Sequence, residues 1–320
     1  MKMKVIGLLV LLVMSVTLEA YDKEGDSLKA VLVTGASSGI GKRTAEVLVE
    51  EGYFVYAGAR KQKDIDALSA HKNMQGVRLD VTVQEDIDAA VELIKKQGRG
   101  LYAVVNNAGV TVFAPLIEVS ESDMQFQMDV NLFGPYRVTK AFAPMIIESK
   151  GRIVNISSIA GTFAAPMLGP YNMSKFSIEA YSEALAKEMK KFDVSVSMIE
   201  PGNYNSNVIR AMKNRMKQND TSSDSLYEKE MTQLFQSITE DRSNHKDPVE
   251  VAKAIVDALA NEQPKLRYMV VPNESEARYT IEKAIERLIQ LNEKHKFSYS
   301  EEQLMEKVES ALNKAKSSSH

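Results

Sequence analysis

Short, almost wholly apolar runs alternate with amphipathic stretches from Leu28 onward. Short, nearly continuous apolar runs are the pattern expected of buried β-strands. Seven strands are predicted, in KAVLVTGASSG (29–39), FVYAGA (54–59), GVRLDV (76–81), LYAVVNNAG (101–109), GRIVNISS (151–158), VSVSMIEPG (194–202) and RYMVV (267–271). The amphipathic stretches 41–51, 85–96 and 122–147 predict helices between them.

Strands that are apolar on both faces, separated by helices, predict a parallel sheet covered on both sides. The crossover connections should be right-handed. The fold class is therefore α/β, a doubly wound parallel sheet of Rossmann type, in one domain over residues 27–275.

Two segments depart from this alternation. Residues 203–246, called the lid segment below, are polar and long, and a loop of this length is usually a functional lid or disordered. Asp247, Pro248 and Glu250 then read as N-cap, N1 and N3 of the next helix. Residues 276–320 form a helical extension that packs on the domain, packs on a second subunit, or takes a substrate or membrane role.

The composition excludes several classes of function. The 320 residues are 44% hydrophobic and 26% charged with a net charge of −3, so no basic excess points to nucleic acid. Cysteine is absent from the sequence, which excludes disulfides and cysteine-based metal sites. The four histidines lie far apart, so no metal site is expected.

The first 26 residues resemble a targeting segment. Lys2 and Lys4 precede an apolar run over residues 5–16, which is too short to span a membrane but long enough for a signal-peptide core. Export or membrane association is predicted, with Ala20 as a cleavage position. The alternative is a cytoplasmic protein whose translation starts at Met14.

VLVTGASSGIGK is a glycine-rich turn between the first strand and the first helix. Glycine tolerates positive φ and close backbone approach, and a helix start presents free N–H groups to an anion. The spacing of Gly35, Gly39 and Gly41 differs from the G-x-G-x-x-G fingerprint. The turn is either a pyrophosphate site or a purely structural strand-to-helix connection.

The end of the second strand indicates which dinucleotide would bind. An acidic residue there holds a ribose 2′-hydroxyl, whereas a basic residue favours a 2′-phosphate. Ala59 and Arg60 occupy this place, with Lys61 and Lys63 next. NADP(H) is therefore predicted as the preferred cofactor, with NAD(H) possible; the alternative is a solvated basic loop.

Tyr171 and Lys175 stand four residues apart. Many helices contain such a pair by chance, so the spacing alone does not distinguish a catalytic pair from an ordinary exposed helix face. Their context decides, because the chain also carries a series of further motifs. These motifs, with the one that holds the pair, are TGASSGIG (34–41), LDVT (79–82), NNAG (106–109), VNLFG (130–134), NISS (155–158), YNMSK (171–175) and PG (201–202). Through them the chain resembles the classical short-chain dehydrogenases/reductases. The motifs occur in the family's order, and the lid segment and the tail lie outside the resemblance.

The resemblance implies a catalytic tetrad of Asn131, Ser158, Tyr171 and Lys175. Ser158 lies thirteen residues before Tyr171, and Ser157 lies one position off that spacing. For Asn131, a role in holding a water and a role in bonding helix backbone are equally favoured. The resemblance implies cofactor contacts from Gly35, Ser37, Gly39, Ile40, Arg60, Asp80, Asn107, Gly109, Tyr171, Lys175, Pro201, Gly202 and Ser206, the last standing where many members have threonine.

This set of residues suits carbonyl reduction. A tyrosine hydroxyl can protonate the carbonyl oxygen, but its unperturbed pKa of about 10 is too high for efficient work near neutrality. The ammonium of Lys175, on the same helix face, should lower the pKa of Tyr171, while Ser158 orients the substrate oxygen.

An NADP(H)-dependent ketone or alcohol oxidoreductase with a steroid-, retinoid- or lipid-like substrate is therefore expected, resembling hydroxysteroid and retinol dehydrogenases. The alternatives are a small-molecule carbonyl reductase, a catalytically silent NADP-binding sensor or scaffold, and an epimerase or dehydratase of the extended branch. The family suggests a homodimer or homotetramer through residues 122–147 and 170–190. The expected apolar wall of the substrate pocket consists of Met212, Met216, Leu226, Met231, Leu234 and Phe235.

Overall fold

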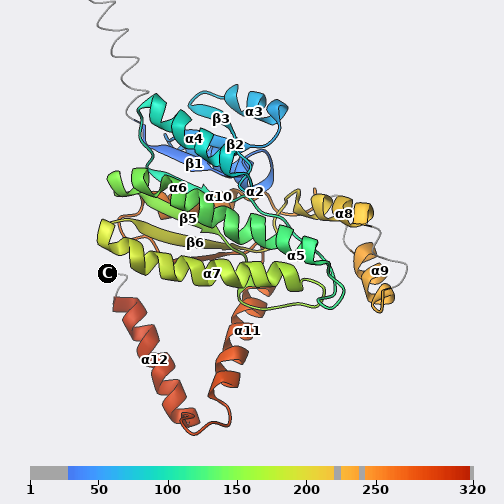
Figure 1. Cartoon of the computed structure of the whole chain (residues 1–320). Helices are drawn as coiled ribbons and strands as arrows, with labels where there is room; N and C mark the ends of the chain where they lie inside the picture. The colour runs from blue at the N-terminus through green and yellow to red at the C-terminus, as the bar shows by residue number, and fades with distance from the viewer. Residues whose placement is uncertain (1–27, 220–224, 238–241, 318–320) are drawn as a thin grey trace, which may run out of the picture. The chain divides into compact units, whose positions relative to one another are not determined.

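A computed structural model describes residues 28–219, 225–237 and 242–317, and the signal-like segment 1–26 lies outside them. Two compact units divide the chain, residues 1–274 and 275–320. The first unit holds a seven-stranded parallel sheet in the order β3-β2-β1-β4-β5-β6-β7 (Figure 1). The strands are β1 (Ala30–Val33), β2 (Phe54–Ala59), β3 (Met74–Arg78), β4 (Ala103–Asn106), β5 (Arg152–Ile156), β6 (Ser195–Pro201) and β7 (Arg267–Val270). The predicted doubly wound sheet is confirmed.

Strand residues alternate between two hydrophobic cores, one on each face of the sheet. In β1, Val31 and Val33 join one core while Ala30 and Leu32 join the other, and all four are almost fully buried. Successive side chains of a strand point to opposite faces, so a strand with no polar position must be covered on both. This explains why the strands read as continuous apolar runs.

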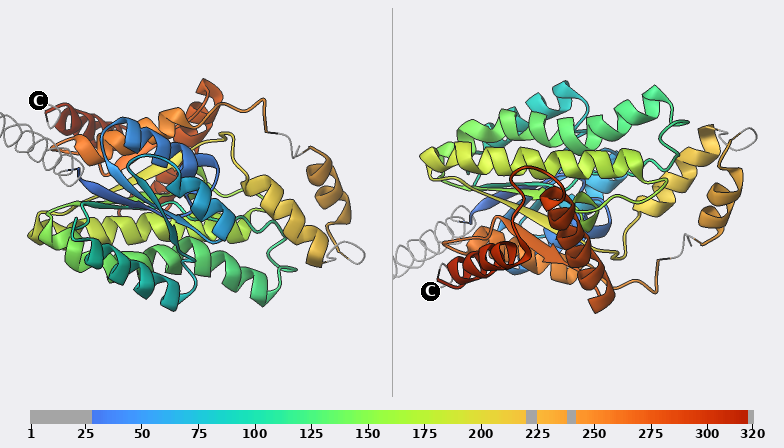
Figure 2. Two further views of the ribbon diagram at one scale, coloured as in Figure 1. Left: turned by 90° about the horizontal axis from the view of Figure 1, so that it is seen from above. Right: turned by 90° about the horizontal axis from the view of Figure 1, so that it is seen from below.

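Helices cover both faces of the sheet (Figure 2). Helices α2 (Gly39–Glu50), α3 (Gln62–Ser69) and α10 (Val249–Ala260) supply the first core, with Leu48 and Ile255 fully buried. Helices α4 (Gln84–Gln97), α6 (Gly134–Glu148) and α7 (Gly169–Met189) supply the second, with Ile94 and Phe142 fully buried. Helix α3 was not predicted, and it places Lys63 on a helix rather than in a basic loop.

Three local expectations need correction. Residues 122–147 are not one helix: α5 (Glu121–Met128) and α6 are separated by a π-helical segment, Asp129–Phe133, which contains Asn131. The third strand begins and ends a few residues earlier than expected. Helix α10 starts at Val249 with Pro248 at its N-cap, while the Asp247 carboxylate accepts a bond from the Val249 N–H at 2.9 Å.

The lid segment carries helices α8 (Val208–Asn219) and α9 (Glu228–Ser237). Two carboxylates of the body hold it. Asp123 receives the Arg215 guanidinium at 2.6 Å, and Glu118 accepts from the Ser225 hydroxyl at 2.6 Å. Arg215 also lies over the Phe126 ring, 3.9 Å from its centroid.

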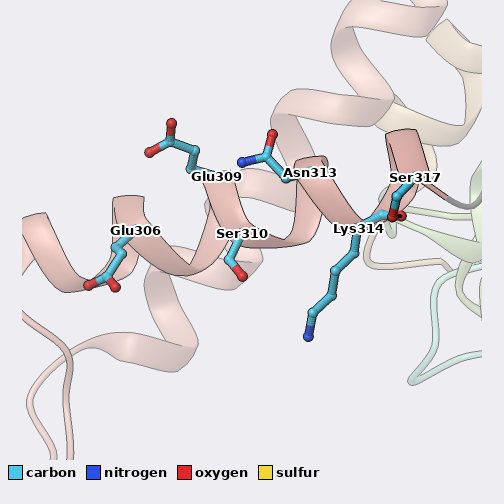
Figure 3. Close-up of a pocket in the computed structure, with 6 residues that line it drawn as sticks. All are labelled: Glu306, Glu309, Ser310, Asn313, Lys314 and Ser317. Atoms are coloured by element: carbon cyan, nitrogen blue, oxygen red, sulfur yellow. Dashed lines mark hydrogen bonds between the residues drawn. The ribbon is translucent and has the colours of Figure 1, made fainter.

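The second unit consists of α11 (Glu274–Asn292), which begins at the unit boundary, and α12 (Glu301–Ser317). Both helices carry exposed apolar side chains, among them Ile285 and Leu312. Figure 3 shows a shallow depression on α12 whose six lining residues all come from that single helix. A depression on one isolated helix face, lined by side chains that project outward, has none of the convergent groups of a binding site. Within the described residues, no helix is long and apolar enough to cross a bilayer.

Candidate active site

A cavity of about 510 Å³ opens at the carboxyl ends of the strands, entirely within the first unit. Ligands of open α/β sheets bind at this edge, next to the point where strand order reverses, here between β1 and β4. Every residue predicted for the site lines the cavity except Asn131. Those lining it are Gly35, Ser37, Gly39, Ile40, Arg60, Asp80, Asn107, Gly109, Ser158, Tyr171, Lys175, Pro201, Gly202 and Ser206.

The glycine turn is shaped by two different constraints. Gly35 and Gly39 have φ of +66° and +55°, a region that residues with a side chain rarely adopt. Gly41 has no such φ, but a Cβ there would overlap the Asn107 side chain and the Gly35 carbonyl. The turn leads directly into the start of α2, whose first backbone N–H groups have no partner within the helix, so it suits an anionic group held by those donors.

Asn107 braces this turn from the end of β4. Its side-chain amide donates to the Thr34 carbonyl at 2.8 Å, and its backbone N–H donates to the Thr34 hydroxyl at 2.9 Å. The same hydroxyl accepts from the Ala108 N–H at 3.0 Å. Thr34 belongs to the TGASSGIG motif, yet its bracing function was not recognised from the sequence.

Arg60 lies at the end of β2, where the sequence places it. Its guanidinium is 64% exposed and lies 3.8 Å from the Asp80 carboxylate. Asp80 is held in turn by the Thr82 hydroxyl at 2.7 Å and the Thr82 N–H at 3.0 Å. An exposed arginine with one loose partner leaves most of its donors available to a bound phosphate.

Ser158, Tyr171 and Lys175 converge on the cavity from β5 and α7. Helix α7 starts at Gly169 with Pro170 in its first turn, which places Tyr171 at the cavity rim. Burial raises the pKa of Tyr171, and its hydrogen bond with Ser158 acts in the opposite direction. The Ser158 hydroxyl itself accepts from the Ala160 N–H at 3.1 Å.

Lys175 is buried below Tyr171. Its ammonium donates to the Ile156 carbonyl at 2.9 Å and lies 5.5 Å from the centre of the Tyr171 ring. Burial lowers the pKa of Lys175 to about 8, with the Glu179 carboxylate opposing that change. The amine therefore remains mostly charged at neutral pH.

Asn131 occupies the π-helical segment behind the cavity. Its carbonyl oxygen accepts from the Val110 N–H at 2.8 Å, and its amide donates to the Val110 carbonyl at 3.0 Å and the Ser174 hydroxyl at 3.1 Å. These bonds support the backbone-bonding role that the sequence had left open.

Several cavity residues were missed in the sequence. Ser157 is 2% exposed, and its hydroxyl has no hydrogen-bond partner within the described part of the chain. Arg242, from the end of the lid segment, donates to the Tyr204 carbonyl at 2.8 Å and also lines the cavity. No local motif marks Arg242, because only the return of the lid brings it to the site.

The predicted apolar wall is wrong for each of its residues whose side chain the structure describes. Leu226 is 82% exposed, and neither it nor Met212, Met231 or Leu234 lines the cavity. The side chains of Met216 and Phe235 lie outside the described residues. The lid instead contributes the first turn of α8, where Val208, Ile209 and Ala211 line the cavity.

Comparison with known proteins agrees with this architecture. The family model described as short chain dehydrogenase matches residues 29–217. Mitochondrial D-beta-hydroxybutyrate dehydrogenase of Bos taurus is 40% identical over 187 residues, 55% of this chain and 54% of that protein. The chain thus spans about half the length of that relative.

A second relative, 3-ketodihydrosphingosine reductase of Bacteroides thetaiotaomicron, is 35% identical over 249 residues, 76% of this chain and 87% of that protein. Two solved structures share the fold. A short-chain dehydrogenase/reductase of Burkholderia phymatum in complex with NAD has a TM-score of 0.71 at 23% identity, covering 85% of this chain and 98% of its own. One of Burkholderia cenocepacia in complex with NADP has a TM-score of 0.64 at 22% identity, covering 83% and 96%.

Proposed function

The chain belongs to the short-chain dehydrogenase/reductase family, and on that premise we propose that it is an NADP(H)-dependent enzyme interconverting a ketone or aldehyde with an alcohol on a bulky apolar substrate. Its class, an oxidoreductase of this family, follows from the family match. The cofactor preference, the substrate and the residue roles are the proposal. The observation that carries the residue roles is the convergence of Ser158, Tyr171 and Lys175 on the cavity at the glycine turn.

Tyr171 is the proton donor to the carbonyl oxygen in reduction and accepts the proton in oxidation. Its hydroxyl lies beside Ser158, which orients the substrate oxygen through its own hydroxyl. The Lys175 ammonium stabilises the phenolate that remains after proton transfer, because an opposite charge close by favours the ionised form. A bound nicotinamide dinucleotide supplies or takes up the hydride.

The chain offers a matched set of groups to hold that cofactor. The N–H groups at the start of α2 suit the pyrophosphate, and Arg60 suits a 2′-phosphate on the adenosine ribose. Solved structures sharing this fold contain NADP in one case and NAD in another, so the preference for NADP(H) rests on Arg60 and on the absence of an acid at the end of β2.

The substrate part of the cavity is apolar. Phe163 and Leu168 line it ahead of Tyr171, and Val110 and Ile209 line it from the loop after β4 and from the lid. Such a lining favours a hydrocarbon body around the reacting carbonyl. The relative from Bacteroides thetaiotaomicron is a 3-ketodihydrosphingosine reductase, which supports a lipid-like ketone as the substrate of this chain.

A turnover assay tests this function. The purified chain is mixed with NADPH or NADH and a panel of ketones ranging from small aliphatic compounds to steroids, retinoids and long-chain keto lipids, and cofactor absorbance is followed. Loss of NADPH absorbance with the bulky ketones is expected. Turnover only with small ketones indicates a small-molecule carbonyl reductase, and NADPH binding without turnover on any compound indicates a silent sensor.

Tyr171→Phe is the decisive variant in that assay. It removes the proton donor while keeping the ring, so kcat should fall by roughly 10²- to 10⁴-fold. The dissociation constant for NADPH, measured by fluorescence titration, should change little. Near-normal turnover by this variant would overturn the mechanism.

Location and assembly are proposed from the sequence and the exposed surface. Residues 1–26 direct export or membrane association, which N-terminal sequencing and fractionation of the native protein test. A homodimer through α6 and α7 is proposed, because Tyr136 on α6 and Met173 on α7 expose 44% and 46% of their surface, and Phe133, directly before α6, exposes 47%. Analytical ultracentrifugation would give a single-chain mass if this assembly is wrong.

A further inference from the structure

A cluster of charged side chains lies on the face of the sheet that α7 covers. The charged cluster consists of Glu179 and Glu183 on α7, Glu200 on β6 and Arg267 on β7. Arg267 pairs in register with Met198 on β6, so Glu200, two residues further along, points to the same face. One guanidinium thereby joins a helix and two strands.

Arg267 contacts all three carboxylates. Its Nη2 donates to Glu179 Oε2 at 2.7 Å and to Glu183 Oε1 at 3.1 Å, and its Nε donates to Glu200 Oε1. Glu179 and Glu200 are 8% and 2% exposed, whereas the Glu183 side chain is 47% exposed. Two buried carboxylates and one half-exposed carboxylate thus share one cation beside α7.

The Glu179 carboxylate lies one helical turn beyond the catalytic lysine. Lys175 and Glu179 are four residues apart on α7, so their side chains lie on one face. Glu179 Oε2 is engaged by Arg267, but Oε1 is buried and has no hydrogen-bond partner among the described residues. The Glu179 carboxylate favours the charged form of Lys175 and so opposes the effect of burial.

The other groups around Lys175 cannot replace this charge. Its own bond goes to a neutral carbonyl, that of Ile156. The ionisable or charged groups facing it in the described structure are Tyr171 and Glu179 on α7, with Glu200 and Arg267 behind Glu179. Glu179 is the only anion among them that is attached to the helix carrying Lys175 and lies one turn from it.

We propose that Glu179, held in place by Arg267, is the counter-charge that keeps Lys175 protonated and positioned beneath Tyr171. The proposal rests on the proposed function, because it assigns Lys175 the task of stabilising the Tyr171 phenolate. Glu179 and Arg267 are positioning residues that act through Lys175. The cluster also anchors Glu200, which directly precedes the cavity residue Pro201.

The test measures the protonation of Lys175 directly and needs no substrate. The full chain is produced with lysine carrying a carbon-13 label at Cε, and the Lys175 resonance is identified by its loss in a Lys175→Met variant. The chemical shift of this resonance is followed from about pH 6 to pH 10. The midpoint of the Lys175 titration should lie near pH 8 in the parent chain.

Glu179→Gln keeps the shape of the side chain and removes its charge, so the Lys175 midpoint should fall by about one pH unit. Glu183→Gln is the matched control, because the same change is made on the same helix, to another partner of Arg267 one turn further from Lys175. It should move the midpoint by no more than about 0.2 units. Glu179→Asp, which keeps the charge, should give a smaller fall than Glu179→Gln and serves as the second variant if Glu179→Gln does not fold.

The proposal is overturned if Glu179→Gln leaves the midpoint unchanged, or if Glu183→Gln lowers it equally. A second readout uses the ketone panel. For any ketone–alcohol pair that the chain turns over, the rate of alcohol oxidation is measured against pH. The change in rate on the alkaline side of this profile should occur at lower pH in Glu179→Gln, in step with the Lys175 midpoint. Absence of turnover on the panel with the expected midpoint shift would count against the proposed function and leave the counter-charge assignment standing.

Discussion

Lys175 is buried away from water, so the surrounding side chains determine how strongly its charged form is favoured. Burial disfavours the ammonium, while Glu179 favours it. Tyr171 is partly buried, and burial raises its pKa and so favours the neutral form, while the hydrogen bond with Ser158 acts in the opposite direction. The chemistry of the site therefore depends on a balance between desolvation and a few nearby groups.

Arg60 provides a prediction about cofactor choice. Arg60→Ala removes a charge-assisted bond to a 2′-phosphate, which should weaken NADPH binding by about 10- to 100-fold. NADH, which has no such phosphate, should bind almost as before. Dissociation constants for both cofactors are measured by fluorescence titration, with Lys63→Ala on α3 as control. Equal losses for the two cofactors would remove the phosphate assignment.

Glu200 provides a prediction about stability and pH. Burial, and then the neighbouring Glu179, raise the pKa of Glu200 from 4.5 to about 7 against the opposing charge of Arg267. The folded state therefore binds this proton more tightly than the unfolded chain. The resulting stabilisation is fully present below about pH 4.5 and is lost as the pH rises through about 7.

Glu200→Gln removes this titration. The free energy of unfolding of the variant, relative to the parent chain, should rise between about pH 4.5 and pH 7 and then level off. Urea unfolding at a series of pH values measures the difference. Parallel curves for the two chains across that range would show that folding does not raise the pKa of Glu200.

At the scale of elements, close approach between β1, α2 and the end of β4 shapes the cofactor turn. Thr34, Asn107 and the backbone of Ala108 tie the two strand ends together. The turn is therefore fixed by tertiary contacts as well as by its own glycines. This rigidity suits a phosphate cradle, because donors that are already in place lose little entropy on binding.

Gly41→Ala tests that packing. A methyl group there would meet the Asn107 side chain and the Gly35 carbonyl, so the thermal midpoint should fall by several degrees and NADPH binding should weaken. Gly109→Ala is the control, since its nearest neighbours would lie 3.6 Å away, an ordinary contact. Differential scanning fluorimetry of the two variants measures their thermal midpoints. Equal midpoints would mean that the turn adjusts to the methyl group.

At the scale of the whole molecule, both hydrophobic cores are complete before the C-terminal extension begins. Among the described residues, neither core includes a side chain after Val270. The extension, residues 275–320, forms a separate compact unit of two helices. Its helices need another surface to cover their exposed apolar side chains, as expected of amphipathic segments.

Deleting residues 275–320 should therefore leave the catalytic unit folded. The thermal midpoint should change by a few degrees at most, and NADPH affinity and turnover with any active ketone should be retained. The oligomer mass of the shortened and full chains, compared by ultracentrifugation, shows whether the extension contributes to assembly. Loss of folding in the shortened chain would show that the extension stabilises the first unit.

Much of this protein was determined by its sequence alone. The apolar runs specify a sheet buried on both faces, because residues that alternate between two cores must all be apolar. The motifs from Gly35 to Gly202 occur in an order that identified the family. The residues predicted for the site also line one cavity, with Asn131 as the exception.

Only the tertiary structure decided the rest, because those features depend on residues far apart in the chain. The π-helical turn at Asn131, the buried contacts of Gly41 and the approach of Arg242 to the cavity have no local pattern. The same holds for Arg267, which follows Lys175 by more than ninety positions yet binds the carboxylate one turn beyond it. Periodicity reports which face of an element is buried, whereas the partners on that face are set by how the elements pack.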